Sequence, residues 1–317
     1  STQDINYGAS ANLTSNGFTK TGYTFASWNT QADGGGDTYN DEVSYTMSSA
    51  SDLNLYAQWT VNAYTITFNT NTGDGGSMST QDINYGASAN LTSNGYTKTG
   101  HSFAGWSTTS GGSVAYSGGA SYTMSSASDV TLYAQWTPNP HTITFNADGG
   151  SGSNTTQAIE YNVAENLDSN PFTKTGYSFA GWATISGGSV IYSEGASYTG
   201  TSDATLYAQW TVNAYTITFN TNTGDGGSMS TQDINYGASA NLTSNGFTKT
   251  GYTFASWNTQ AGGGGDTYNN AVSYTMSSAS DVTLYAQWIV NAYTITFNTN
   301  TGDGGSMSTQ DINYGAS

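Results

Sequence analysis

Apolar and polar side chains alternate over short stretches of this chain, as they do in half-buried β-strands. Residues 64–68 read Tyr-Thr-Ile-Thr-Phe, and residues 80–85 repeat the alternation after a Gly-rich turn, which predicts a β-hairpin. Later, Leu132, Ala134 and Trp136 share one face of a further predicted strand. No stretch has apolar residues at the 3.6-residue spacing of a helix, so any helix is expected to be a single turn.

The same pattern recurs along the whole chain. Tyr-Ala-Gln-Trp occurs at residues 56–59, 133–136, 207–210 and 285–288, in steps of 77, 74 and 78 residues. An aromatic cluster that ends in Trp follows each copy of Lys-Thr-Gly, and the copies begin at Lys20, Lys98, Lys174 and Lys249. Self-similarity at a nearly fixed period is the signature of a tandem array.

A period of about 76 residues favours small separate domains over a solenoid, whose units are shorter and cannot bury a core alone. The fold class predicted is mainly β, with tandem small domains arranged as beads on a string. The predicted units are a partial repeat at 1–59 that lacks its first strand, repeats at 64–136, 141–210 and 215–288, and a partial repeat of two strands at 293–317. Connectors of four residues reach at most about 14 Å, so neighbouring domains are expected to touch.

Composition excludes several classes of protein. Four Lys and Arg against 21 Asp and Glu give a formal net charge of −17, which argues against binding to nucleic acid. The chain has no Cys, so disulfides and Cys-based metal sites are excluded. No apolar run approaches the length of about 20 residues that spans a membrane. Tyr, Phe and Trp make up 14% of the residues, which argues for packed cores rather than disorder.

The order of motifs within one unit resembles the Listeria–Bacteroides repeat, a family that includes the B-repeats of internalin-type surface proteins. The motifs are Tyr-Thr-Ile-Thr-Phe, then Lys-Thr-Gly with its aromatic cluster, then a Gly-Gly turn and Leu-Tyr-Ala-Gln-Trp. The resemblance implies a small β-grasp-like domain that occurs in tandem in secreted or surface-anchored proteins. Two positions depart from the pattern, His101 in place of Tyr and Asn162 in place of Gly.

The two ends of the sequence are related. Residues 1–10 and 308–317 are identical, and residues 1–59 differ from residues 230–288 at five positions. Two interpretations stay open: the sequence is a piece of a longer array, or residues 293–297 of one chain complete the 1–59 unit of the next and build a filament. Residues 308–317 would compete with residues 1–10 for one position, which favours the first interpretation.

Candidate catalytic residues are few, and we expect no enzyme, no cofactor and no metal. His101 and His141 are the only imidazoles, and neither recurs in the other units, so both are interpreted as surface residues of edge strands. Ser and Thr have no recurrent base to activate them. The acidic segment from Asp33 to Glu42 offers oxygen ligands for calcium, but residues 262–271 lack three of its four carboxylates, which favours a solvated turn.

Two covalent modifications are hypotheses, an isopeptide bond and N-glycosylation. The single Lys of each unit, namely Lys20, Lys98, Lys174 or Lys249, could form an isopeptide bond with a recurrent Asn, or its stem could lie along the aromatic cluster with the ammonium in water. Four sites match the N-glycosylation pattern, at Asn12, Asn90, Asn154 and Asn241. The third unit has Asn166-Leu-Asp168 where the others have the sequon, so the fold does not demand it.

We therefore expect the structural repeat region of a long extracellular surface protein, which forms a semi-rigid stalk or filament. Its expected partners are its own neighbouring repeats and other copies of the chain, head to tail. The alternative is a multivalent adhesin that binds glycans or a host protein through exposed aromatic residues. We expect neither nucleic-acid binding nor membrane insertion of this segment.

Overall fold

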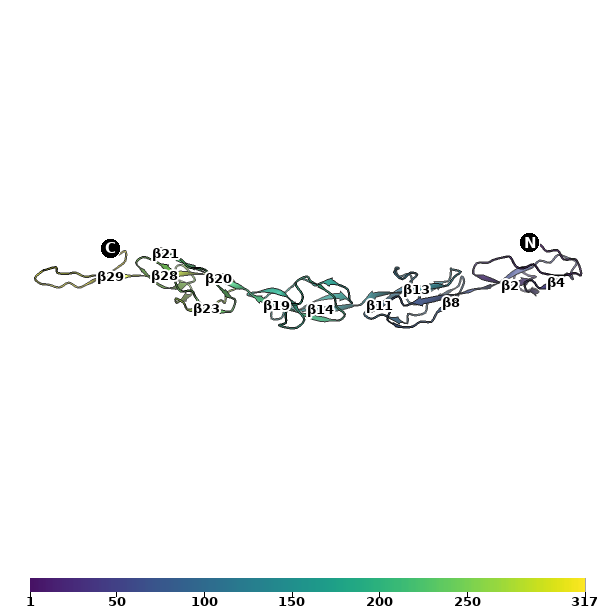
Figure 1. Ribbon diagram of the computed structural model, residues 1–317, viewed down its shortest axis with the longest axis horizontal. Helices are drawn as coiled ribbons and strands as arrows, with labels where there is room; N and C mark the ends of the chain where they lie inside the picture. Colours follow the sequence, from purple (N-terminus) through teal and green to yellow (C-terminus); the bar gives the residue numbers. More distant parts are fainter. Residues whose placement is uncertain (317) are drawn as a thin grey trace. The chain divides into compact units, whose positions relative to one another are not determined.

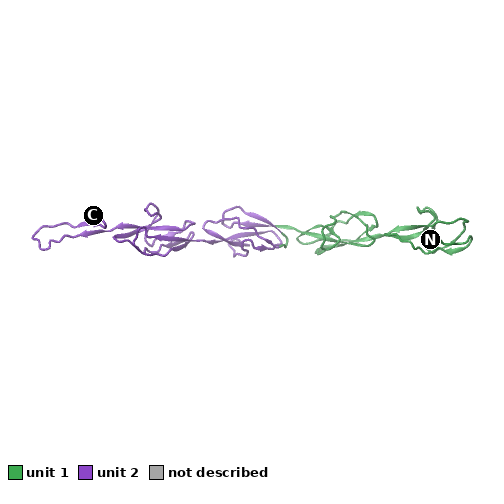
Figure 2. Ribbon diagram, turned by 90° about the horizontal axis from the view of Figure 1, so that it is seen from above, with its two compact units in different colours: residues 1–141, 160–163 green, residues 142–159, 164–317 purple. Residues whose placement is uncertain are grey.

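The computed structural model describes residues 1–316, and those residues form strands, turns and loops without a helix (Figure 1). It follows that the described part of the chain has no helix suited to crossing a membrane. Contacts divide the chain into two compact units, residues 1–141 with 160–163 and residues 142–159 with 164–317 (Figure 2). The predicted fold class, tandem small β domains, is confirmed.

Each complete repeat is built around one sheet with the strands in the order second, first, last, third. In residues 64–136 these strands are β8 (Gln81–Asn84), β6 (Ala63–Asn69), β13 (Val130–Pro138) and β11 (His101–Ser107). In residues 141–210 they are β15 (Thr155–Glu160), β14 (Pro140–Asn146), β19 (Ala204–Val212) and β17 (Tyr177–Ala183). In residues 215–288 they are β22 (Gln232–Asn235), β20 (Ala214–Asn220), β28 (Val282–Val290) and β25 (Tyr252–Asn258), and β26 (Thr267–Tyr268) extends this sheet.

The two central strands of each sheet are parallel, whereas the last strand of each repeat pairs antiparallel with the third. In residues 64–136 the parallel register runs from Ile66 opposite Val130 to Asn69 opposite Tyr133. The other complete repeats have the same register between β14 and β19 and between β20 and β28. Parallel neighbours need a long crossover, and here nearly the whole repeat lies between its first and last strands.

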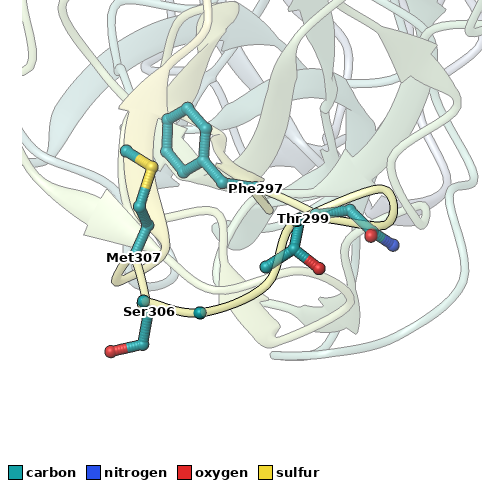
Figure 3. A pocket seen from close by; sticks show the side chains of 8 residues that line it. Phe297, Thr299, Ser306 and Met307 are labelled. Atoms are coloured by element: carbon teal, nitrogen blue, oxygen red, sulfur yellow. The ribbon is translucent and has the colours of Figure 1, made fainter.

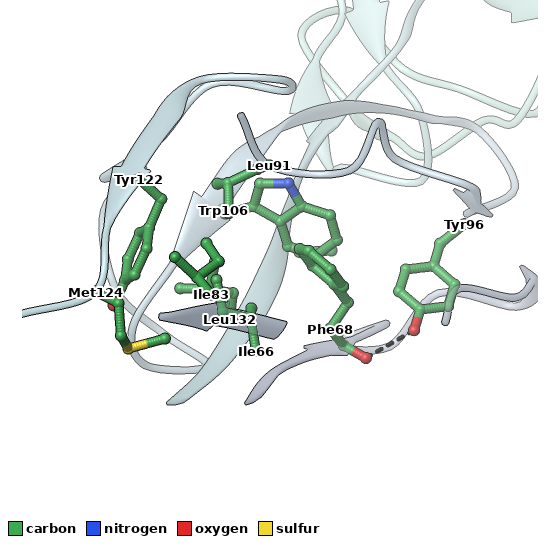
Figure 4. Close-up of a cluster of buried hydrophobic side chains, with 10 residues drawn as sticks. Ile66, Phe68, Ile83, Leu91, Tyr96, Trp106, Tyr122, Met124 and Leu132 are labelled. Atoms are coloured by element: carbon green, nitrogen blue, oxygen red, sulfur yellow. Dashed lines mark hydrogen bonds between the residues drawn. The ribbon is translucent and has the colours of Figure 1, made fainter. Parts of the chain in front are cut away.

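Short ladders lie outside the main sheets. One kind joins β9 (Ser88–Asn90) to β12 (Ser121–Thr123), β16 (Glu165–Asn166) to β18 (Ser197–Tyr198), β23 (Ser239–Asn241) to β27 (Ser273–Thr275) and β1 (Ser10–Asn12) to β4 (Ser44–Thr46). The other joins β7 (Gly75–Gly76) to β10 (Tyr96–Thr97) and β21 (Gly226–Gly227) to β24 (Phe247–Thr248). Residues in or beside these ladders, such as Leu91, Tyr96 and Tyr122, complete the core of their repeat (Figure 4).

The core of each complete repeat surrounds a Trp of the third strand. Trp106, Trp182 and Trp257 have no exposed surface, and Phe68 packs on Trp106 with ring centroids 4.8 Å apart (Figure 4). A register shift between Phe103 and Gly105 adds one residue to β11. Residues three apart normally point to opposite faces of a strand, but this bulge lets Phe103 and Trp106 both pack on the core, with ring centroids 5.0 Å apart.

The two ends of the chain hold parts of a repeat. Residues 1–59 form the three-stranded sheet β3 (Thr38–Tyr39), β2 (Tyr23–Asn29) and β5 (Tyr56–Val61). Near the other end, β29 (Ala292–Ile295) and β30 (Gln310–Asn313) form a hairpin. In the described part of the chain no first strand lies beside β5, and Trp28 is only half-buried, whereas its equivalent Trp257 is fully buried.

Replacing Trp257 by Ala should destabilise the repeat at residues 215–288 by about 3–5 kcal/mol, the usual cost of truncating a large buried aromatic side chain. Hydrogen exchange at the amides of β20 and β28 measures this loss repeat by repeat. The matched control is Trp28→Ala, at the half-buried equivalent position, for which we expect a clearly smaller loss in β2 and β5. Equal losses at the two positions would contradict the account of the core.

Candidate functional site

The feature that recurs between the repeats is a junction built on a single residue. One Asn separates the last strand of one repeat from the first strand of the next, and these residues are Asn62, Asn139, Asn213 and Asn291. The strands on both sides are paired up to that residue, since Val61 lies opposite Tyr23 and Ala63 lies opposite Asn84. The ordered strands therefore extend into the four-residue connectors expected from the sequence, and leave one residue between them.

Asn213 makes hydrogen bonds to the repeats on both sides. Its backbone N–H donates to the carbonyl of Gly176 in the preceding repeat, at 2.9 Å, and its own carbonyl accepts the N–H of Tyr236 in the following repeat, also at 2.9 Å. Its side-chain oxygen accepts the hydroxyl of Ser178 at 2.7 Å. Asn62, Asn139 and Asn291 make the same three bonds with the equivalent residues. Each linking residue is thus tied to both of its neighbours.

A tyrosine of the following repeat covers a glycine of the preceding one. A Cβ on Gly176 would clash with ring carbons of Tyr236, and the φ of Gly176 is +77°. Both the close approach and the positive φ require Gly here. The equivalent pairs are Gly22 with Tyr85, Gly100 with Tyr161 and Gly251 with Tyr314.

Further aromatic rings flank the covering tyrosine from both repeats. Tyr177 and Tyr215 meet the ring of Tyr236 edge to face, with centroids 6.3 and 6.4 Å apart. The same arrangement joins Tyr23 and Tyr64 to Tyr85. Edge-to-face pairs of this kind contribute about 0.5–1.5 kcal/mol beyond the area that they bury, so the junction is a small aromatic interface.

Asn162, one of the two departures from the family pattern, fits the backbone of its position. It follows the covering tyrosine Tyr161, where the other repeats have Gly86 and Gly237 with φ near +77°. Asn162 itself has a φ of +54°. Asn is among the few residues other than Gly that tolerate this left-handed conformation, so the exchange leaves the turn intact.

The lysine of each Lys-Thr-Gly motif lies beside the junction. The ammonium of Lys20 lies 3.9 Å from the ring centroid of Tyr23, and Lys174 and Lys249 lie over their tyrosines at 4.7 and 4.2 Å. Lys98 precedes His101 instead of Tyr, and its ammonium donates to the hydroxyl of Thr72 at 3.0 Å. These contacts are cation–π or hydrogen-bonding interactions of lysines that are exposed or half-buried.

An aspartate holds the turn that carries the junction glycine in two of the repeats. The carboxylate of Asp74 accepts the backbone N–H of Thr99 at 2.8 Å, next to Gly100, and Asp225 does the same for Thr250. Hydrogen bonds from the side chain and backbone of Thr99, with a smaller contribution from the charge of Lys98, lower the pKa of Asp74 below its ordinary value. The charged form of this aspartate is therefore the one that supports the turn.

Both histidines lie at the junction that contains Asn139, and the interpretation of His141 as an edge-strand surface residue is wrong. His141 is 9% exposed and stands in β14, a central strand of its sheet, in the place of Tyr64. His101 lies in the edge strand β11 as expected, half-buried, with its ring 5.7 Å from that of Tyr161. Sequence patterns placed both at strand starts but did not show which strand would be central.

The acidic segment from Asp33 to Glu42 makes hydrogen bonds within the fold. Asp41 accepts the backbone N–H of Asn16 at 2.9 Å, and its equivalent Asn270 accepts that of Asn245 at 2.8 Å. An amide oxygen thus replaces a carboxylate oxygen with no change in the contact. Among residues 1–316, no three His, Asp or Glu residues gather as a metal site would require.

An aspartate that recurs before the last strand of each complete repeat bonds to the backbone of the first strand. Asp129, Asp203 and Asp281 accept the backbone N–H of Thr65, Thr142 and Thr216 at the beginning of each first strand, at 2.6–2.8 Å. An isopeptide bond needs a buried lysine, whereas Lys20 is exposed and the other three lysines are half-buried. The glycosylation sites at Asn12, Asn90, Asn154 and Asn241 are all exposed, and their modification stays a prediction.

A pocket in the C-terminal hairpin is lined in part by residues whose equivalents are core residues in a complete repeat. Phe297, Thr299, Ser306 and Met307 line it (Figure 3). In the complete repeat at 215–288, the equivalents of Phe297 and Met307 are Phe219 and Met229, which pack in the core with Trp257. The pocket is therefore the place of a repeat's own side chains, and strand exchange between chains stays a prediction.

Comparison with known proteins places the repeats in a family. The model of the Listeria-Bacteroides repeat domain matches residues 1–58, 64–135, 141–209 and 215–287, which confirms the resemblance. A protein of Evansella cellulosilytica that is named as a Gly-rich membrane protein is 33% identical over 294 residues, 89% of this chain and 32% of that protein.

Two further relatives match shorter shares of their own length. A second protein of the same organism, named as a membrane protein, is 31% identical over 283 residues, 86% of this chain and 39% of its own length. Internalin H of Listeria monocytogenes is 37% identical over 145 residues, 43% of this chain and 24% of that protein. The chain thus spans about a third of the length of these curated relatives.

Replacing Gly176 by Ala should loosen the junction at Asn213, because the new methyl group would displace the ring of Tyr236 in addition to straining a positive φ. We expect hydrogen exchange at the amides of Asn213 and Tyr236 to accelerate by about tenfold or more, as for a loss of about 1.4 kcal/mol. Gly237→Ala is the control, since Gly237 has a φ of +76° with nothing within 4 Å. Equal acceleration in both variants would show that the ring contact contributes nothing.

Acid should loosen the turns held by Asp74 and Asp225. Because the pKa of Asp74 is lowered below its ordinary value of 3.8, its stabilising contribution is complete above that value and is lost as the pH falls through the lowered pKa. NMR of the Thr99 amide during an acid titration measures this loss. Asp74→Asn keeps an acceptor oxygen without the titration, so its Thr99 amide should respond less. If the Thr99 amide responded to acid as strongly in Asp74→Asn as in the unmodified chain, the role of the carboxylate would be contradicted.

Proposed function

This chain belongs to the family of Listeria–Bacteroides repeats, and on that premise we propose that it forms a semi-rigid stalk within a long extracellular surface protein. The relatives support a repeat region of a surface protein. The observation that best supports a stalk is the junction between repeats. The same three hydrogen bonds and the same tyrosine-over-glycine contact occur at all four places where one repeat follows another.

A linker of one residue leaves little freedom between repeats. Asn213 is bonded through its N–H, its carbonyl and its side chain, and the strands before and after it are paired up to the neighbouring residues. A flexible connector would need several residues free of such bonds. If repetition of this junction gives successive repeats the same relation, the length of the proposed stalk grows with the number of repeats.

The distribution of aromatic residues favours the stalk over the adhesin. Between residues 60 and 290 every Tyr, Phe and Trp side chain is buried or half-buried. Aromatic residues that bind glycans would need exposed ring faces. The larger exposed apolar side chains in this range are aliphatic, such as Ile185 and Ile191. The adhesin remains the second candidate, for which these residues offer no recurrent site.

Solution scattering and negative-stain imaging of residues 1–317 test the proposal. We expect an elongated particle whose length varies little from molecule to molecule, and Gly176→Ala should introduce a bend at one position whereas the control Gly237→Ala should not. A glycan array probes the adhesin with the same material. Particles that bend freely at every junction would contradict the stalk, and specific glycan binding by the unmodified chain would favour the adhesin.

A further inference from the structure

We propose that each complete repeat is a mechanical clamp that resists stretching of the chain from its two ends. The inference deepens the proposed function and rests on it, since tension reaches a repeat only when the repeat stands in series along a stalk. Two neighbouring strands of each complete repeat run in the direction that such a clamp requires, in each of the three repeats separately.

The first and last strands of a repeat are neighbours and run in the same direction. In residues 64–136 the chain comes in at the beginning of β6 and leaves at the end of β13, and Ile66 to Asn69 pair with Val130 to Tyr133. Tension on the two ends of the repeat therefore pulls these strands lengthwise past each other. All hydrogen bonds of the pair carry the load together, whereas strands pulled apart from one end lose their bonds one after another.

Side-chain bonds reinforce the parallel pair at both of its ends. At the beginning of β6, the carboxylate of Asp129 accepts the N–H of Thr65 at 2.8 Å. Just beyond the end of β6, the indole N–H of Trp136 donates to the carbonyl of Thr70 at 3.0 Å, and the Asn71 side chain donates to the carbonyl of Ala134 at 2.7 Å. The same three bonds recur in residues 215–288 through Asp281, Trp288 and Asn222.

The junctions pass the load from one clamp to the next. The last strand β19 ends at Val212 and the first strand β20 begins at Ala214, so the force leaves one central strand and enters the next through Asn213 alone. No loop with slack lies between them. The first and last strands of the repeats thus carry the force along the chain. The other strands and loops of each repeat belong to the crossover that connects these two strands.

Residues 1–59 provide an internal comparison in the same molecule. They differ from residues 230–288 at five positions, but within the described residues 1–316 no parallel strand lies beside β5. The strand β5 is also shorter at its beginning. It begins at Tyr56, whereas its equivalent β28 begins at Val282, which corresponds to position 53 of the first segment. If the parallel pair is the clamp, this segment should yield first when the whole chain is stretched.

Single-molecule stretching of residues 1–317 from its two ends tests the clamp. We expect early, weak events from residues 1–59 and from the C-terminal hairpin of β29 and β30, and then three strong events of similar length. Each repeat of about 72 residues should release up to about 240–260 Å of chain, less its folded length. At one constant force the complete repeats should survive at least about tenfold longer than the first segment, as for one more backbone hydrogen bond broken in the transition state.

The direction of pulling separates the clamp from ordinary stability. The chain has no Cys, so Ala63→Cys and Ser128→Cys, both at exposed positions, provide handles at the same end of β6 and β13. Force between these handles separates the strands one bond at a time, and we expect that repeat to survive at least about tenfold less long than under end-to-end tension. An unchanged circular dichroism spectrum and thermal transition of the double variant confirm that it folds.

Equal lifetimes in the two directions would overturn the proposal, as would complete repeats that yield no later than residues 1–59. Neither outcome bears on the stalk itself, because the stalk depends on stiffness at the junctions and scattering measures that without force. Conversely, repeats that resist tension while the junctions bend freely would leave the clamp standing and contradict the stalk.

Discussion

The pairing of the first strand with the last strand of each repeat is the interaction on which the other features depend. It brings residues more than sixty positions apart side by side, as Ile66 and Val130 are, and closes the core around the third-strand Trp. Because the two strands are parallel, the chain also leaves the repeat at the end opposite to the one at which it enters. Where that strand is missing, in residues 1–59, the last strand is shorter and Trp28 is only half-buried.

The junction between repeats follows from the position at which the last strand ends. A strand that leaves at the far end can continue into the next repeat after one residue. That Asn bonds to the preceding repeat through its N–H and side-chain oxygen and to the following repeat through its carbonyl. Gly176 lets the ring of Tyr236 approach the backbone more closely than any side chain would permit. The net charge of −17 is spread over the repeats, and weak mutual repulsion of this kind helps to keep identical domains from misassociating.

Much of the fold could be predicted from the sequence because alternating apolar residues report local strand structure directly. The hairpin of residues 64–85, the buried face of Leu132 and Ala134 and the tandem period all follow from local patterns. The junction could not be derived in this way, although Asn recurs in all four connectors, because its partners lie in two different repeats. The burial of His141 depends on the order of strands in the sheet, which alternation does not encode.

The most direct test of the stalk is the distribution of distances across one junction. Spin labels on Ser197→Cys and Ser273→Cys, both exposed, would report on the junction at Asn213 by pulsed electron resonance, since the chain has no other Cys. A fixed junction predicts one narrow distance that broadens when Gly176 is replaced by Ala and stays narrow when Gly237 is replaced. A broad distribution in the chain with Gly at both positions would contradict the account.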